Sequence, residues 1–140
     1  MSTATAKPSQ QTAFTSGMAA EAIANGASDV SNTLDNSGAT RSGYLSGEIA
    51  YQYTTAPTAA KQLALYVERS MDGTNFEDAS PNNGWIMTLS PTADTDAHRF
   101  ALPAIPLQPE SYRLRVVNVD TGQTVAVTLN LYTFSDTSEA

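Results

Sequence analysis

The sequence predicts an all-β protein, an antiparallel β-sandwich of about seven to eight strands with a jelly-roll-like arrangement and an extended N-terminal arm. From residue 43 onward apolar side chains recur with a period of two, which is typical of strands that bury one face. Turn signals rich in Gly, Asn and Asp separate these segments at short intervals. Many short strands with no convincing helix between them are the pattern of a sandwich.

The clearest strand covers residues 43–54. Leu45, Ile49 and Tyr51 fall on one face of this segment, and polar residues fall between them. The same alternation predicts further strands, which cover residues 61–69, residues 85–89, a segment from His98 to Leu102, and two final segments that contain Leu114 with Val116 and Val125 to Leu131. Because a turn signal at residues 120–123 lies between the last two segments, we expect them to pair as a hairpin.

The N-terminal part of the chain differs in composition from the rest. Residues 1–42 are rich in Ser, Thr, Ala, Asn and Gly, and their large apolar side chains are too few to offset the conformational entropy lost on ordering. We therefore expect residues 1–24 to form a flexible, extended arm and residues 25–140 to form the β-sandwich domain.

Two segments near the predicted boundary need a separate assignment. Residues 19–24 fit either a short helix that stops at Gly26 or an edge strand, and we favour the extended form. Residues 28–35 alternate between apolar and polar positions and are followed by a turn cluster. We expect this second segment to add one strand to the domain.

Composition and charge limit the possible partners. The 140 residues suffice for one domain, and 14 acidic against seven basic residues give a net charge of −7. Because phosphate backbones are bound by clustered Lys and Arg, the sequence predicts no nucleic-acid partner. The longest apolar run is far shorter than the roughly 20 residues that cross a bilayer, and the first residues lack the apolar stretch of a secretory signal. We expect no membrane partner and synthesis in a cytoplasm.

The sequence offers no catalytic constellation. Its one histidine, His98, lies in the run from Asp94 to Arg99, and a hydrolase would need a nucleophile beside it. No serine lies in a Gly-x-Ser-x-Gly elbow, and the chain has no cysteine. Five loop carboxylates form two acidic clusters whose spacing differs from that of an EF-hand; they are Asp72, Glu77, Asp78, Asp94 and Asp96. We expect no enzyme activity, no cofactor and no bound metal.

The run from Ser70 to Phe76 predicts a tight turn between two strands. It resembles the Asp-box hairpin of sialidase propellers, although the residue that separates Asp and Gly in that motif is missing between Asp72 and Gly73. An Asp at such a place accepts hydrogen bonds from the backbone N–H groups that follow it. We therefore expect a hairpin turn capped by Asp72. Paired catalytic carboxylates are not identifiable, so the likeness predicts no glycosidase activity.

Four residues are candidates for contact with a neighbouring subunit. Arg113 and Arg115 are separated by one residue in a predicted strand, so both emerge on the same face. The alternative is that they form a stripe of solvated charge. Phe14 and Met18 are large apolar residues in the predicted arm, which would become ordered on a partner.

The order of the elements resembles a known family of proteins. The segments that carry the resemblance are Asn-Gly-Ala-Ser-Asp-Val-Ser-Asn-Thr-Leu-Asp-Asn (25–36), Leu-Tyr-Val-Glu-Arg-Ser-Met-Asp-Gly-Thr-Asn-Phe-Glu-Asp (65–78), Arg-Phe-Ala-Leu-Pro-Ala-Ile-Pro-Leu-Gln-Pro (99–109), Tyr-Arg-Leu-Arg-Val-Val-Asn (112–118) and Val-Thr-Leu-Asn-Leu-Tyr (127–132). Over about residues 25–134 they look like small β-sandwich virion proteins of tailed bacteriophages.

This resemblance implies a structural role. Similar proteins decorate or cement phage heads: they bind the outside of a shell of major capsid protein and clamp neighbouring capsomers, often as trimers. The implied partners are the major capsid protein and two further copies of this chain in a homotrimer, and the implied location is the capsid surface of a virion. Two alternatives remain: a tail or neck component, or a carbohydrate-binding module that aids host attachment through Tyr44, Tyr66 or Trp85.

Overall fold

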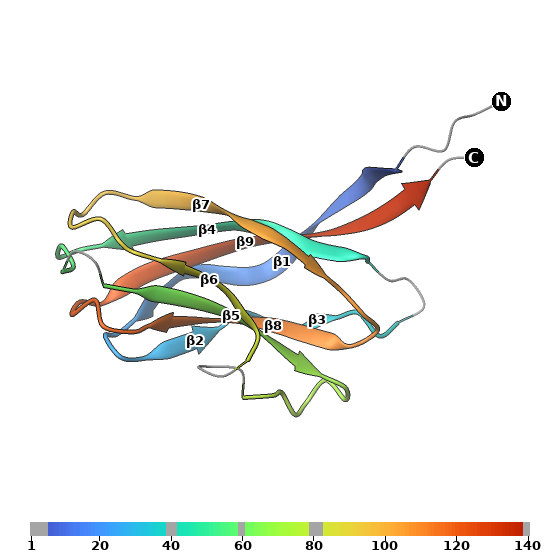
Figure 1. The fold of residues 1–140 in the computed structure, drawn as a ribbon, viewed down its shortest axis with the longest axis horizontal. Helices are drawn as coiled ribbons and strands as arrows, with labels where there is room; N and C mark the ends of the chain where they lie inside the picture. The colour runs from blue at the N-terminus through green and yellow to red at the C-terminus, as the bar shows by residue number, and fades with distance from the viewer. Residues whose placement is uncertain (1–5, 39–41, 59–60, 79–82, 139–140) are drawn as a thin grey trace.

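The chain folds into two antiparallel sheets that pack against each other (Figure 1), so the predicted β-sandwich is confirmed. The computed structural model describes residues 6–38, 42–58, 61–78 and 83–138, with side chains between residues 17 and 134. Within these ranges the strands are β1 (Ala6–Ile23), β2 (Ser28–Val30), β3 (Leu34–Asp35), β4 (Tyr44–Tyr53), β5 (Leu63–Ser70), β6 (Trp85–Leu89), β7 (His98–Pro106), β8 (Ser111–Asn118) and β9 (Val125–Ser138).

The topology is that of a jelly roll. Sheet A has the strand order β1-β9-β4-β7, and sheet B has the order β2-β8-β5-β6, with β3 also paired to β8. Along the chain, β5 and β6 pair as neighbours in one sheet, whereas most other connections cross between the sheets. If β2 and β3 count as one interrupted strand, two four-stranded sheets result, which is the jelly-roll arrangement. The two segments replace the single strand that we predicted for residues 28–35.

The hairpin predicted for the last two strands is wrong. β8 belongs to sheet B and pairs with β5, whereas β9 belongs to sheet A and pairs with β1 and β4. The connection over residues 119–124 therefore passes from sheet B to sheet A at one end of the sandwich (Figure 1). Alternating apolar residues on both sides of a Gly-containing turn fit a hairpin within one sheet and an arch between two sheets equally well. In both cases the apolar faces of the two strands point toward one core.

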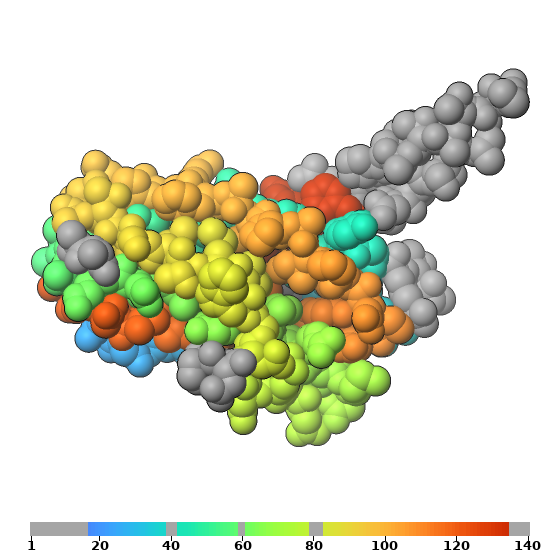
Figure 2. All heavy atoms as spheres, viewed as in Figure 1, coloured from blue at the N-terminus to red at the C-terminus, as the bar shows by residue number. Residues whose placement is uncertain are grey.

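The core lies between the sheets and takes side chains from both. Sixteen buried hydrophobic residues form it: Met18, Ile23, Leu45, Ile49, Tyr51, Tyr53, Leu63, Leu65, Leu89, Leu102, Leu114, Val116, Val125, Val127, Leu129 and Leu131. Atoms of the segment from β6 through β7, yellow to orange, cover the side of the sandwich that faces the viewer in Figure 2. In β4, β8 and β9 the buried apolar residues alternate with more exposed ones, so the predicted alternation is confirmed in these strands.

β1 is one of the two edge strands of sheet A. The sequence places residues 1–24 in the arm, yet Met18 and Ile23 are 6% and 2% exposed and belong to the core. The preference for an extended chain over a helix at residues 19–24 is confirmed as far as Ile23. The pairing with β9 shifts register on both sides of Met18, and Ala20 has a φ of 45°. Such irregularities hinder an edge strand from pairing with another chain.

The other end of β1 leaves the sandwich together with the end of β9. β4 pairs with β9 as far as Phe134, and in the described residues the continuation of β9 pairs with β1 alone, from Ser135 opposite Gln10 to Ser138 opposite Ala6. Figure 1 shows these two segments projecting side by side from the body. We call residues 6–10 and 135–138 the terminal ribbon.

Asn118 joins the end of β8 to both neighbouring turns. Its side chain is fully buried, and its Nδ2 donates to the carbonyl oxygens of Ile23 at 3.0 Å and Gln123 at 2.8 Å. Its Oδ1 accepts a hydrogen bond from the hydroxyl of Thr121, which is also fully buried. The one amide thus ties the end of β1 to the arch between the sheets.

We expect Asn118→Ala to lower the free energy of unfolding by about 2 to 3 kcal/mol, because it removes a fully buried amide that hydrogen-bonds the carbonyls of Ile23 and Gln123 and the hydroxyl of Thr121. Urea denaturation monitored by circular dichroism measures the change. The control is Asn32→Ala on an exposed side chain, expected to shift stability by less than about 0.5 kcal/mol. Equal stability of the two variants would contradict this role of Asn118.

Candidate functional site

Arg113 and Arg115 lie on the outer face of sheet B, on either side of one carboxylate. Arg113 Nε donates to Glu68 Oε1 at 2.7 Å, and Arg115 donates to Oε2 from Nε at 2.9 Å and to Oε1 from Nη2 at 3.2 Å. Arg115 Nη1 also donates to Ser28 Oγ at 2.8 Å. The predicted placement of both arginines on one face is confirmed. We call Glu68, Arg113 and Arg115 the Arg-Glu-Arg cluster.

The cluster is held in a fixed geometry. The side chain of Glu68 is 3% exposed, whereas those of Arg113 and Arg115 are 25% and 24% exposed. The Arg113 guanidinium carbon lies 4.1 Å from the centre of the Phe76 ring, a cation–π contact. Burial raises the pKa of Glu68, but hydrogen bonds and charge from the two arginines outweigh it and keep this pKa below its usual value. One carboxylate faces two guanidiniums, so the cluster keeps one unit of positive charge.

An aromatic row continues from the cluster across sheet B. Tyr66 is paired with Arg115 on one side and with Trp85 on the other. Trp85 is 63% exposed, whereas Tyr66 is 8% exposed. Trp, Tyr and Arg are the residue types most often found at the energetic centre of protein interfaces. The outer face of sheet B therefore has the chemistry of a contact surface, although contact by Arg113 and Arg115 with a neighbouring subunit stays a prediction.

The two apolar interface candidates lie on β1. Met18 is buried in the core, where little of its surface is left for a partner. The backbone of Phe14 is paired with Leu131 of β9, and its side chain lies outside the described residues. The contacts that we predicted for these two residues therefore stay predictions.

The cap predicted for Asp72 is confirmed, but the hairpin is not, because β5 ends at Ser70 and the next described strand, β6, begins only at Trp85. Asp72 Oδ1 accepts hydrogen bonds from the backbone N–H groups of Thr74 and Asn75, both at 2.8 Å. Gly73 has a φ of 77°, a backbone conformation that is strained for any residue with a side chain. The hydrogen bonds from Asn75, Thr74 and Ser70 hold the pKa of Asp72 well below its usual range. These contacts make Asp72 a structural cap, as the sequence predicts.

His98 and the loop carboxylates form local contacts. His98 Nε2 lies 2.9 Å from Asp94 Oδ1, and the His98 ring stacks on Tyr51 with the ring centres 5.3 Å apart. The hydrogen bond from His98 lowers the pKa of Asp94. In the part of the chain that the structure describes, no three His, Asp or Glu side chains come together in a way that could hold a metal ion.

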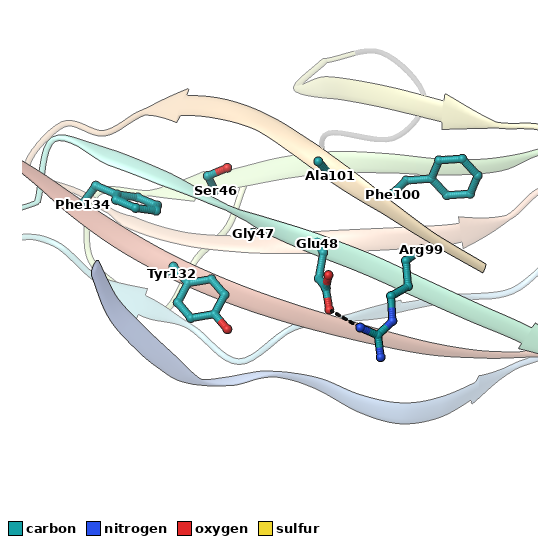
Figure 3. Close-up of a pocket in the computed structure, with 8 residues that line it drawn as sticks. All are labelled: Ser46, Gly47, Glu48, Arg99, Phe100, Ala101, Tyr132 and Phe134. Carbon is teal, nitrogen blue, oxygen red and sulfur yellow. Dashed lines mark ion pairs between the residues drawn. The ribbon is translucent and has the colours of Figure 1, made fainter. Parts of the chain in front are cut away.

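A hollow that the sequence analysis missed lies on the outer face of sheet A (Figure 3). It has a volume of about 420 Å³ and is lined by Ser46, Gly47, Glu48, Arg99, Phe100, Ala101, Tyr132 and Phe134. Tyr132 and Phe134 project from β9, and the ion pair between Glu48 and Arg99 joins β4 to β7. We call this feature the Gly47 hollow.

The backbone of β4 is irregular beside the hollow. Gly47 has a φ of 143°, and a Cβ atom built there would lie 2.0 Å from the backbone oxygen of Asn130. The register of β4 against β7 also shifts between Leu45 and Gly47. The close approach of the β9 backbone therefore requires glycine at position 47, and the bulge bends β4 beside the hollow. An isolated Gly inside a strand pattern signals such a bulge, and it is the sign from which sequence reasoning could have found the hollow.

No protein-family model matches the sequence, and no curated protein matches it. Among the described residues there is also no helix that could span a membrane.

We expect Glu68→Gln to lower the free energy of unfolding by about 2 kcal/mol at pH 7, because two partly buried guanidiniums lose their counter-charge. The folded chain lowers the pKa of Glu68, so its stabilisation is present above about pH 4.5 and is lost as the pH falls through the folded-state pKa. Urea titrations at several pH values should show the gap to the wild type narrowing below about pH 4.5.

The matched control for this prediction is Glu21→Gln, on an exposed position of β1. It should change stability by less than about 0.5 kcal/mol at pH 7. A gap between wild type and Glu68→Gln that stays constant down to about pH 2.5 would show that the carboxylate charge of Glu68 is not the stabilising element.

Proposed function

We propose that this chain is a non-enzymatic structural protein of a tailed-phage virion, which decorates and stabilises the outer surface of the capsid by binding the major capsid protein. The proposal takes its partner and location from the resemblance over residues 25–134. Jelly rolls occur in viral capsid proteins and in lectins, so the fold supports a binding role by analogy.

The observation that carries the proposal is the terminal ribbon. Two strands pair with each other outside the sandwich, and neither is joined there by a third strand in the described residues. A two-stranded ribbon is only marginally stable in water, and its outer edges present backbone N–H and C=O groups that another chain can pair or cover. Five residues of strand reach roughly 17 Å, enough to extend onto a neighbouring subunit. The ribbon is therefore suited to contact another chain.

The outer face of sheet B also supports a role in binding rather than in catalysis. The Arg-Glu-Arg cluster and Trp85 form a second contact surface on sheet B, with one unit of positive charge in a chain of net charge −7. Because a repeating shell offers many binding sites, many copies with individually weak contacts would together attach firmly. A homotrimer is the form we propose, since pairing between subunits covers exposed sheet edges.

We expect a variant that lacks residues 1–16 to fold and to bind capsids more weakly than the full chain. It keeps the core residues Met18 and Ile23 but removes the β1 half of the terminal ribbon. The measurement mixes each protein with purified phage capsids that lack it, and quantifies the protein that sediments with them. The thermal unfolding transition of the truncated variant checks its fold.

A variant that lacks residues 1–5 is the control, because it leaves every described strand of the ribbon in place. It should bind as the full chain does. If the variant without residues 1–16 occupied capsids to the same level as the full chain, the ribbon would not be the contact. If the full chain failed to sediment with capsids, the proposed role itself would fail.

A further inference from the structure

We propose that the Gly47 hollow binds a neutral saccharide. This inference is independent of the proposed capsid role, because it concerns the outer face of sheet A rather than the terminal ribbon or sheet B. The hollow has a volume of about 420 Å³, within the range of roughly 300 to 1,000 Å³ that is typical of small-molecule sites.

The two sides of the hollow differ in chemistry. Tyr132 and Phe134 are two residues apart on β9, so both rings project from the same face of the sheet, and both are half-buried. Glu48 and Arg99 form the polar side, with Glu48 Oε1 and Arg99 Nη1 3.8 Å apart. A pyranose carries an apolar C–H face and a rim of hydroxyl groups. An aromatic ring can pack against the C–H face, while a carboxylate accepts hydrogen bonds from the hydroxyl groups and a guanidinium donates hydrogen bonds to them.

The polar side is already positioned before any ligand arrives. Asn130 Nδ2 donates to Glu48 Oε1 at 3.0 Å, which fixes one carboxylate oxygen and leaves Oε2 without a described partner. Across the floor, Ala101 is the residue paired with Glu48, and its small side chain keeps the hollow open beside Gly47. The paired charges of Glu48 and Arg99 cancel, so the site favours an uncharged ligand over an anion or a cation.

Two other occupants fit less well. A peptide that adds as a strand needs free backbone groups, whereas β4 beneath the hollow is paired with β7 on one side and with β9 on the other. A glycosidase substrate would need two carboxyl groups flanking the scissile bond, and Glu48 is the one carboxylate among the lining residues. The geometry therefore favours binding of a sugar without its hydrolysis.

The test screens the full-length protein against an array of neutral glycans and measures the best ligand by isothermal titration calorimetry. We expect Tyr132→Ala, which removes the stacking ring, and Ala101→Phe, which fills the hollow from an exposed position, each to weaken binding by at least about tenfold. Ala101→Phe keeps the test decisive if Tyr132→Ala impairs folding. Thermal unfolding verifies each variant.

The matched control is Trp85→Ala, which removes an exposed aromatic ring from sheet B and should leave the affinity unchanged within about twofold. The proposal is overturned if no neutral glycan binds above background. It is also overturned if Ala101→Phe binds as the wild type does, or if Trp85→Ala abolishes binding, since the sugar would then lie on the other sheet. None of these outcomes bears on capsid sedimentation, so this proposal and the capsid role fail separately.

Discussion

The pairing of β9 on both of its sides is the constraint on which the other features depend. β9 holds β4 along one edge and β1 along the other, and its inward residues from Val125 to Leu131 lie in the core. The same strand presents Tyr132 and Phe134 on the outer face, and its last residues form half of the terminal ribbon. A shift of β9 by one residue would exchange its buried and exposed faces, so the core, the hollow and the ribbon are specified together.

The arch from β8 to β9 makes this pairing possible. It delivers the chain from sheet B to sheet A, and Asn118 satisfies the carbonyl groups exposed by the change of direction. The contact surfaces follow from this arrangement, because each sheet keeps one face in the core and presents the other to solvent. Sheet B presents the Arg-Glu-Arg cluster and Trp85, and sheet A presents the Gly47 hollow. Two surfaces of different chemistry thus lie on opposite faces of the sandwich.

Local patterns in the sequence are sufficient to predict strands such as β4 and β6 and the cap at Asp72. The predicted strand at residues 85–89 matches β6, and that at 43–54 contains β4, because alternation and turn residues act over a few positions. The pairing of strands is a property of the whole chain, and this is why the last hairpin was wrong and why Met18 was assigned to the arm. Glu68 meets Arg113 and Arg115 for the same reason, through a register that no local pattern encodes.

The candidate surfaces were predictable only in part. The alternation of Arg113 and Arg115 correctly predicts one shared face, whereas the buried carboxylate between them and the Gly47 hollow arise from neighbouring strands. Among the aromatic residues considered for sugar stacking, Tyr66 is almost completely buried and Trp85 is exposed. A sequence pattern gives the face of a strand on which a side chain lies, but it does not give the depth to which neighbouring residues cover it.

Electron cryo-microscopy of capsids mixed with the full-length protein would test the proposed capsid role. We expect copies on the local symmetry axes of the shell, with the sandwich on the outside and the terminal ribbon in contact with the major capsid protein or an adjacent copy. Copies at the tail vertex alone would assign the protein to the tail. Bound copies whose ribbons point into solvent, or capsids without added density, would contradict the claim that the ribbon attaches this protein to the shell.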